Sequence, residues 1–251
     1  MSALILKIIA MITMTIDHVG VVFNMPQTYR YIGRIAFPLY ALMITEACNH
    51  LKNDNKRFLR YILQLAILAV VSEIGFDLCF YQKIPAMEMQ NQILQFFLYA
   101  LTVYFSQEQN NNMVTVAVLW VWIIFINFSG AVGYFAAGII FMLLMHVYTS
   151  HLLNKSFIIR LAYCFCAVLL LIFLEQIDGY TLHFHSIGKT LQYMISHHSY
   201  YSVTNLHTLL SVPLLALYNG QYGKMPSWFK PVYLLYYPVH LYVLALIDHF
   251  I

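Results

Sequence analysis

Residues 3–23 read ALILKIIAMITMTIDHVGVVF, an almost continuous apolar run that carries Asp17 and His18 side by side about two-thirds of the way along. A run of this length can cross the hydrocarbon core of a bilayer as a helix. A charged residue at such a depth costs at least about 2.5 kcal/mol on insertion scales unless it faces protein or water. The Asp17–His18 pair therefore predicts a functional site inside a membrane protein.

The rest of the chain has the same apolar character. Of its 251 residues, 61% are hydrophobic and only 9% are charged, whereas soluble domains carry about 25% charged residues. The net charge of +3 is small and scattered, which disfavours nucleic acid as a partner. The first apolar run is too long for a cleaved signal peptide. We therefore expect an all-α, polytopic bundle of transmembrane helices, folded as a single domain over residues 1–251.

The hydropathy pattern predicts nine spans, at residues 3–23, 31–49, 59–80, 90–106, 113–127, 131–149, 158–177, 203–219 and 231–250. Cytoplasmic loops of membrane proteins carry an excess of Lys and Arg. With the amino terminus in the cytoplasm, nine basic residues fall on the inner side and four on the outer side. The strongest marker is the cluster Lys52, Lys56 and Arg57. We therefore predict a cytoplasmic amino terminus, which puts Asp17 and His18 in the outer half of the membrane.

Lys7 and His18 are expected to share one helix face. Eleven residues make almost three helical turns, so the two side chains lie about 16 Å apart along the axis. Lys7 at the cytoplasmic mouth suits a phosphate group, and the pantetheine arm of coenzyme A has about the reach to His18. A neutral imidazole in an apolar site can act as a general base. The alternatives are a lysine that snorkels to the interface and a structural histidine bonded to a neighbouring helix.

Asp17 and His18 are expected to contact different partners, because consecutive helical residues point about 100° apart. Arg34 opens the second predicted span after a short loop and is the expected partner of Asp17. Such an ion pair either stabilises the contact between the two spans or orients the guanidinium toward an oxyanion. Glu175 lies at the end of a predicted span, where placement at the membrane interface is sufficient.

Two further sets of polar residues share helix faces. The last predicted span has one face with the spacing i, i+3, i+4, i+7, formed by Tyr233, Tyr236, Tyr237 and His240. This face is either an aromatic packing stripe or a polar surface of the site. Pro238 on the same turn leaves a backbone carbonyl without its helical hydrogen bond. Glu73 and Asp77, at i and i+4, also share a face. Two carboxylates there imply that one is protonated or that a cation lies between them.

The remaining histidines and the cysteines predict no metal site. Residues 178–201 are expected to form an outer loop, and its histidines have no carboxylate or cysteine companions at fixed spacing, so we interpret them as solvated rather than as zinc ligands. These histidines are His183, His185, His197 and His198. The four cysteines form no CxxC pair and are interpreted as small packing residues.

Three motifs, in order along nearly the whole chain, resemble the TraX family. The first combines residues 7–20, KIIAMITMTIDHVG, with residues 33–38, GRIAFP. The second is SEIGFD at 72–77, where the family usually has proline at the position of Gly75. The third is PLLALYNGQYGK at 213–224, followed by Lys230 and by YYPVHL at 236–241. Ala47 departs from the family's usual glycine, and this bears on the acceptor more than on the core chemistry.

The resemblance implies an integral membrane acyltransferase of the bacterial cytoplasmic membrane, in contact with membrane lipid. The founding member acetylates the amino terminus of a conjugative pilin. By resemblance, acetyl-CoA is the donor and the acceptor is an extracytoplasmic pilin-like protein or a surface glycan. His18 is then the catalytic histidine, and Lys224 and Lys230 join Lys7 as contacts for the coenzyme A phosphates. The resemblance also implies supporting catalytic roles for Asp17, Arg34, Tyr237 and His240.

Two non-enzymatic functions compete with this interpretation. A transporter or flippase would use Asp17, Glu73 and Asp77 as a proton or cation path, and it predicts no binding of coenzyme A. An assembly factor would use residues 178–201 to hold a surface protein, and it predicts tolerance of substitution at His18.

Overall fold

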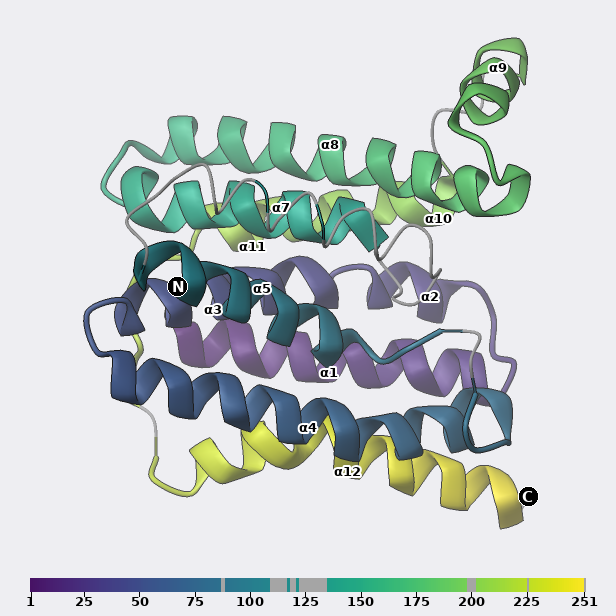
Figure 1. Ribbon diagram of the computed structural model, residues 1–251, viewed down its shortest axis with the longest axis horizontal. Coiled ribbons are helices and arrows are strands. Elements are labelled where there is room, and N and C mark those ends of the chain that lie inside the picture. Colours follow the sequence, from purple (N-terminus) through teal and green to yellow (C-terminus); the bar gives the residue numbers. More distant parts are fainter. Residues whose placement is uncertain are drawn as a thin grey trace.

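The computed structural model describes residues 1–86, 89–108, 117, 121, 135–197, 202–224 and 226–250, and every regular element in these ranges is a helix. The elements are α1 (Ala3–Val22), α2 (Thr28–Gly33), α3 (Ala36–Leu51), α4 (Asn55–Tyr81), α5 (Gln92–Glu108), α7 (Phe135–Val147), η1 (Tyr148–Leu152), α8 (Phe157–Phe184), α9 (Ile187–His197), α10 (Val203–Leu206), η2 (His207–Ser211), α11 (Val212–Ala216) and α12 (Phe229–Phe250). The long helices lie side by side in one bundle (Figure 1). The all-α prediction is therefore confirmed for the described residues.

Four of the described helices, α1, α4, α8 and α12, are long and apolar enough to cross a membrane. They correspond to the first, third, seventh and ninth predicted spans. The second span is divided into α2 and α3, and the eighth into the short α10, η2 and α11. The fifth span, 113–127, lies outside the described residues apart from two positions. The count of nine and the orientation in the membrane stay predictions.

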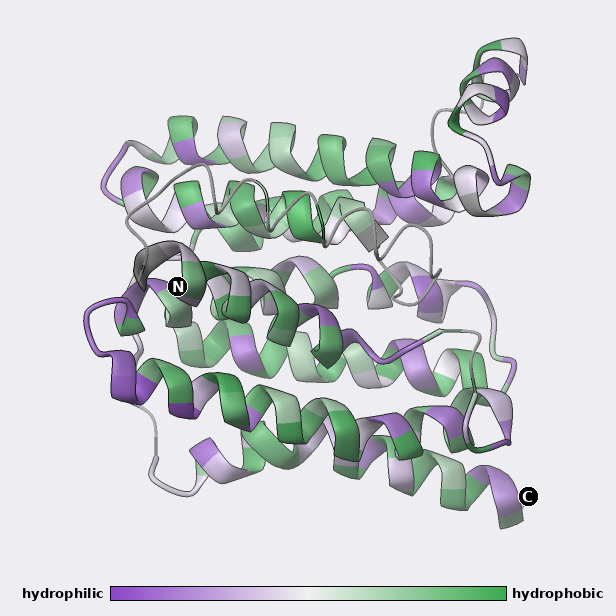
Figure 2. Cartoon of the chain, viewed as in Figure 1, coloured by the Kyte–Doolittle hydropathy of each residue, from purple (hydrophilic) through white to green (hydrophobic). Residues whose placement is uncertain are grey.

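The outward surface of the bundle is apolar. Val70 on α4 and Ile158 on α8 are 70% and 77% exposed, and hydrophobic residues dominate the long helices (Figure 2). Exposed apolar surface of this extent is unfavourable in water. It suits helices whose backbone hydrogen bonds are satisfied internally and whose side chains face lipid.

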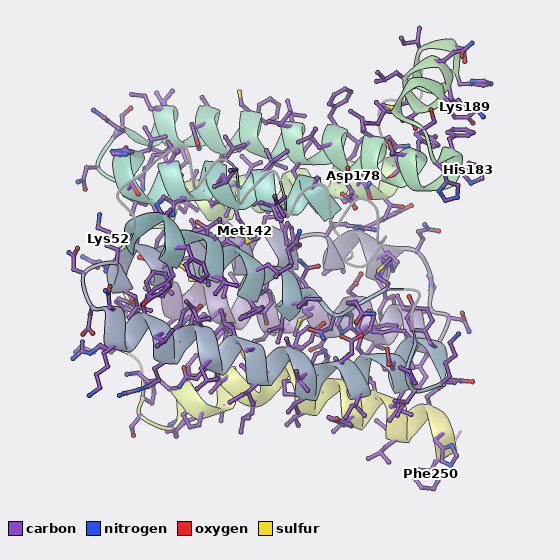
Figure 3. The ribbon with its side chains drawn as sticks, viewed as in Figure 1. Lys52, Met142, Asp178, His183, Lys189 and Phe250 are labelled. Carbon is purple, nitrogen blue, oxygen red and sulfur yellow. The ribbon has the colours of Figure 1, made fainter. Side chains whose placement is uncertain are left out.

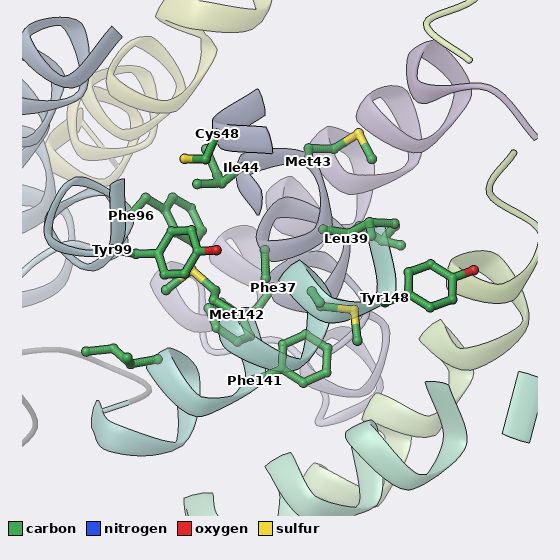
Figure 4. Packing of buried hydrophobic residues seen from close by; sticks show 14 of the residues in the cluster. Phe37, Leu39, Met43, Ile44, Cys48, Phe96, Tyr99, Phe141, Met142 and Tyr148 are labelled. Atoms are coloured by element: carbon green, nitrogen blue, oxygen red, sulfur yellow. The ribbon is translucent and has the colours of Figure 1, made fainter. Parts of the chain in front are cut away.

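The core is centred on α3, which is buried on most of its faces. The Phe37 ring lies between Phe96 of α5 and Phe141 of α7, with ring centroids 6.2 and 6.1 Å away (Figure 4). Pro38 lies in the first turn of α3, where a missing N–H costs no intrahelical hydrogen bond. Phe37 and Phe96 also line the cavity described below.

The connection 217–223 binds the start of α1. Its carbonyl groups accept hydrogen bonds from the amino terminus and from the first N–H groups of the helix: Met1 N is 2.6 Å from Leu217 O, and Ala3 N is 2.8 Å from Gln221 O. A helix start leaves such donors without intrahelical partners. Gly223 has φ +76°, and a Cβ there would lie 2.9 Å from Ser2 Oγ. The backbone conformation and the close contact with Ser2 therefore explain why glycine occupies position 223 in the third motif.

The basic turns gather at one end of the bundle. The amino terminus, the α3–α4 turn and the α11–α12 connection lie together there, and the carboxyl terminus lies at the other end (Figure 1). Lys52 marks the first end and Phe250 the second (Figure 3). The predicted orientation requires the basic turns to lie at the same end of the bundle, and they do.

The expectation of a loop at residues 178–201 is wrong for 178–197; residues 198–201 lie outside the described part, and the outer position stays a prediction. Helix α8 continues to Phe184, and α9 occupies Ile187–His197. Apolar residues recur here every three or four positions, which is the helical period. Asp178, expected in the loop, instead accepts a hydrogen bond from Ala137 N at 2.9 Å, in the first turn of α7.

Candidate functional site

A cavity of about 590 Å³ runs through the bundle between α1, α2, α3, α4, α5, α8 and α12. On α4 its lining residues extend from Tyr61 to Tyr81, which is roughly 30 Å at 1.5 Å per residue. Most of the lining is aliphatic or aromatic. The charged lining residues are Asp17, Arg30, Arg34 and Glu175. The cavity is therefore long, apolar along its length, and charged near one end.

His18 lies on the wall of this cavity and pairs with His240 of α12. The distance from His18 Nδ1 to His240 Nε2 is 2.8 Å, and the two rings are stacked with centroids 5.0 Å apart. His240 Nδ1 is in turn 2.8 Å from the carbonyl oxygen of Tyr236. This bond to a neighbouring helix is the contact that the structural alternative for His18 predicts, and the place of His18 on the cavity wall is what the catalytic interpretation requires.

The direction of these hydrogen bonds follows from the carbonyl group, which can only accept. His240 Nδ1 therefore carries the proton, and in a neutral ring its Nε2 is an acceptor. His18 Nδ1–H then donates to His240 Nε2. In the neutral His18 ring this leaves Nε2 with its lone pair. The pairing therefore selects the tautomer in which His18 Nε2 is a base.

The face predicted for the last span is confirmed, because its residues meet α1. The Lys7 ammonium lies 4.5 Å from the centre of the Tyr233 ring, and the Tyr236 and Thr15 hydroxyl groups are hydrogen-bonded. Tyr237 contacts His18 edge-on with ring centroids 6.3 Å apart, and it lines the cavity. We call this row of contacts the α1–α12 seam.

The expected Asp17–Arg34 ion pair is wrong. Asp17 Oδ2 instead lies 2.6 Å from Arg30 Nη1, and Arg34 Nη1 lies 3.0 Å from Glu175 Oε1 of α8. The reason is α2, a separate short helix that places Arg30 one turn before Arg34. A Cβ on Gly33 would collide with Asp17, so this glycine lets α2 approach α1 closely enough for the Arg30 contact.

Glu175 is part of the site, contrary to the expectation of simple interfacial placement. Its side chain is 12% exposed, and that of Arg34 is 17% exposed. The sequence analysis did not name Arg30 and gave Glu175 no role in the site. Two signals were present: Arg30 and Arg34 are four residues apart, and Glu175 is an acidic residue at the end of a long apolar run. The two ion pairs together tie α1, α2 and α8 around one end of the cavity.

Glu73 and Asp77 share a face of α4 as predicted, but they lie outside the cavity lining. Glu73 Oε2 accepts hydrogen bonds from Asn91 N at 3.0 Å and from the Asn91 side chain. Asp77 Oδ2 accepts from Ala86 N at 2.9 Å. These carboxylates fasten the chain that follows α4 back onto that helix, whereas Asp17 lines the cavity.

The three lysines expected to contact coenzyme A lie at the other end of the bundle. Lys7 stacks over Tyr233, whose ring lines the cavity. Lys230 is the second residue of α12, and Lys224 follows Gly223, which packs on Ser2. None of the three lines the cavity itself. They surround the end opposite to the two ion pairs.

No group of three or more metal-binding side chains occurs among the described residues. Of the four histidines in 178–201, His198 lies outside the described part. His183 and His185 are at the end of α8, and His197 stacks on Tyr193 with ring centroids 4.2 Å apart.

Comparison with known proteins gives one match. A family model described as TraX protein matches residues 2–248, which is almost the whole chain and includes all three motifs. No curated protein and no solved structure matches the chain.

Proposed function

This chain belongs to the TraX family, and on that premise we propose that it is a membrane-embedded acyltransferase. Acetyl-CoA is the donor, bound from the cytoplasmic side. The acceptor is an amine or a hydroxyl group on an extracytoplasmic pilin-like protein or surface glycan. One observation carries the proposal: His18, in the tautomer with a basic Nε2, stands on the wall of a long apolar cavity.

The two ends of the cavity suit the two substrates. Lys7, Lys224 and Lys230 supply three positive charges at the amino-terminal end, and lysine is a common phosphate contact. The cavity volume of about 590 Å³ lies in the usual range for ligand sites, about 300–1,000 Å³. Apolar walls keep water from the thioester and so limit its hydrolysis. The pantetheine arm would extend along α4 toward His18.

His18 acts as the general base in the proposed reaction. As the acceptor nitrogen or oxygen attacks the thioester carbonyl carbon, its proton passes to His18 Nε2. The tetrahedral intermediate then breaks its C–S bond, and the departing sulfur takes the proton back from His18 Nε2. His240 keeps Nδ1 of His18 as a donor throughout, so that Nε2 faces the reacting atoms.

The oxyanion of the intermediate needs a donor near His18. Tyr237 and Arg34 are the candidates, since both line the cavity. Tyr237 contacts the His18 ring directly, whereas Arg34 is held by Glu175. We assign the oxyanion contact to the Tyr237 hydroxyl and a positioning role at the acceptor end to Arg34.

Thermal unfolding of the detergent-purified protein with acetyl-CoA tests the proposal. A ligand that binds only the folded state at 100 times its Kd stabilises it by about 2.7 kcal/mol. We expect acetyl-CoA to raise the unfolding midpoint, and the Lys7→Gln/Lys230→Gln double variant to need more ligand for the same shift. No shift at millimolar acetyl-CoA contradicts donor binding. The transporter alternative predicts that result, together with uptake driven by a pH gradient.

A further inference from the structure

Helix α9 exposes an apolar stripe. Thr190 and Met194 are buried, whereas Ile187, Leu191 and Ile195 are 63%, 43% and 64% exposed. Residues four apart advance by only about 40° around a helix, so these three side chains form one stripe beside the buried face. The opposite side carries Lys189, Gln192 and Ser196. The apolar arc of α9 is therefore wider than the surface against which it packs.

The direction of α9 differs from that of the long helices. Helices α1, α4, α8 and α12 run along a common axis, whereas α9 runs across it and projects sideways from the bundle (Figure 1). The long helices are those suited to cross a membrane. A helix that runs across their axis extends along the plane of a membrane that they cross.

The junction of α8 and α9 has the composition of a membrane interface. Helix α8, which is long and apolar enough to cross a membrane, ends at Phe184. Tyr180 and Phe184 at this end cluster with Tyr193 of α9, with ring centroids 5.0 to 6.2 Å apart. Tyrosine is enriched where membrane proteins pass through the headgroup layer. Helix α9 therefore begins at headgroup depth.

We propose that α9 is an interfacial helix whose Ile187–Leu191–Ile195 stripe inserts into the lipid leaflet at this end of the bundle. Its polar side faces the headgroups and water, and the Lys189 ammonium contacts lipid phosphate. A lipid surface fits better than a protein, because a stable protein interface buries about 800 Å² on each partner, far more than three aliphatic side chains supply. The inference does not depend on the acyltransferase proposal.

Fluorescence quenching in liposomes tests this placement. The full-length protein carries Cys166→Ser, because Cys166 is the exposed cysteine and the other three are buried. Leu191→Cys and the matched control Gln192→Cys, on the polar side, are labelled with an environment-sensitive dye. Both are reconstituted with phosphatidylcholine and phosphatidylglycerol that include lipid carrying a nitroxide on the acyl chain, a few carbons below the headgroup. We expect the nitroxide lipid to quench the label at position 191 at least threefold more strongly than the label at 192.

Equal quenching at the two positions overturns the proposal. So does a label at 191 that is shielded from lipid, together with disulfide cross-linking of the unlabelled Leu191→Cys variant to a second protein chain under oxidising conditions, since that result shows a protein partner. Ile195→Cys and Ser196→Cys form a second matched pair in case the Leu191 variant does not fold. The same threefold contrast is expected there, and its absence overturns the proposal equally.

Discussion

The α1–α12 seam and the acidic face of α4 both place ionisable side chains inside a predicted span, but they use them differently. On α4, Oε2 of Glu73 and Oδ2 of Asp77 are engaged by N–H groups of the chain that follows the helix. On the seam, His18 uses Nδ1 for His240, and its ring lines the cavity. The first arrangement fastens one segment of the chain to another. The second is the arrangement that the proposed reaction uses.

This contrast shows that an ionisable residue in an apolar run indicates function only when the hydrogen-bond partners of its atoms are known. In the sequence, Glu73 and Asp77 were candidates for the proton or cation path of the transporter alternative. Their contacts are structural, and they lie outside the cavity lining. Four variants test this distinction: two on the seam, one at the charged end of the cavity and one on α4.

His18→Ala has the largest expected effect. Removal of a general base typically lowers a rate by about 10²–10⁴-fold, and we expect acetyl transfer from acetyl-CoA to fall by that factor. The thermal unfolding midpoint should change little, because the variant removes one hydrogen bond and part of a stacked pair. Transfer is measured as release of free coenzyme A thiol in the presence of acceptor. A folded His18→Ala protein with full activity contradicts the role of the seam.

Arg34→Met has the next largest effect, on stability. It leaves Glu175 without the Arg34 partner in a mostly buried position, and such a loss costs about 3–5 kcal/mol. The double variant Arg34→Met/Glu175→Leu removes both charges and should recover most of that loss. The free energy of unfolding in mixed micelles is the measurement. A double variant as unstable as the single one would show that the pair is not coupled.

The sequence predicted much of this fold and the centre of the site. Length and hydropathy predicted α1, α4, α8 and α12, because a long apolar run has one low-energy form in lipid. Helix phase alone predicted that Tyr233, Tyr236 and His240 share a face. The contact between α1 and α12 was not predicted, but the two faces that form it were, because both helices are long and regular.

The ion pairs at the charged end could not be predicted in the same way. Their geometry depends on the break between α2 and α3, which shifts Arg30 toward Asp17 and turns Arg34 toward Glu175. Such a break reflects tertiary packing around Gly33 rather than local preference. Residues 178–201 were misinterpreted because their polar composition obscured a helical period.

His240→Ala has a smaller expected effect on rate than His18→Ala, because His240 acts through His18. Without its acceptor, the His18 ring can rotate and exchange tautomers, and misplacement by about 1 Å costs roughly 10²-fold. We expect kcat to fall tenfold to a hundredfold with little change in the KM for acetyl-CoA. His240→Gln, whose amide oxygen can accept the same hydrogen bond, should recover part of the loss. Equal defects in both variants would indicate a steric role instead.

Asp77→Asn has the smallest expected effect and tests the other side of the comparison. The amide oxygen still accepts from Ala86 N, but the charge that strengthens this bond is lost, and the net cost of such a change is about 1 kcal/mol. The free energy of unfolding should fall by that amount, while the rate of acetyl transfer stays within about twofold of the parent protein. A proton or cation path through α4 requires an ionisable carboxyl group at this position. Loss of transport or of transfer in Asp77→Asn, with stability unchanged, would therefore place function on α4 and reverse the distinction drawn between the two helix faces.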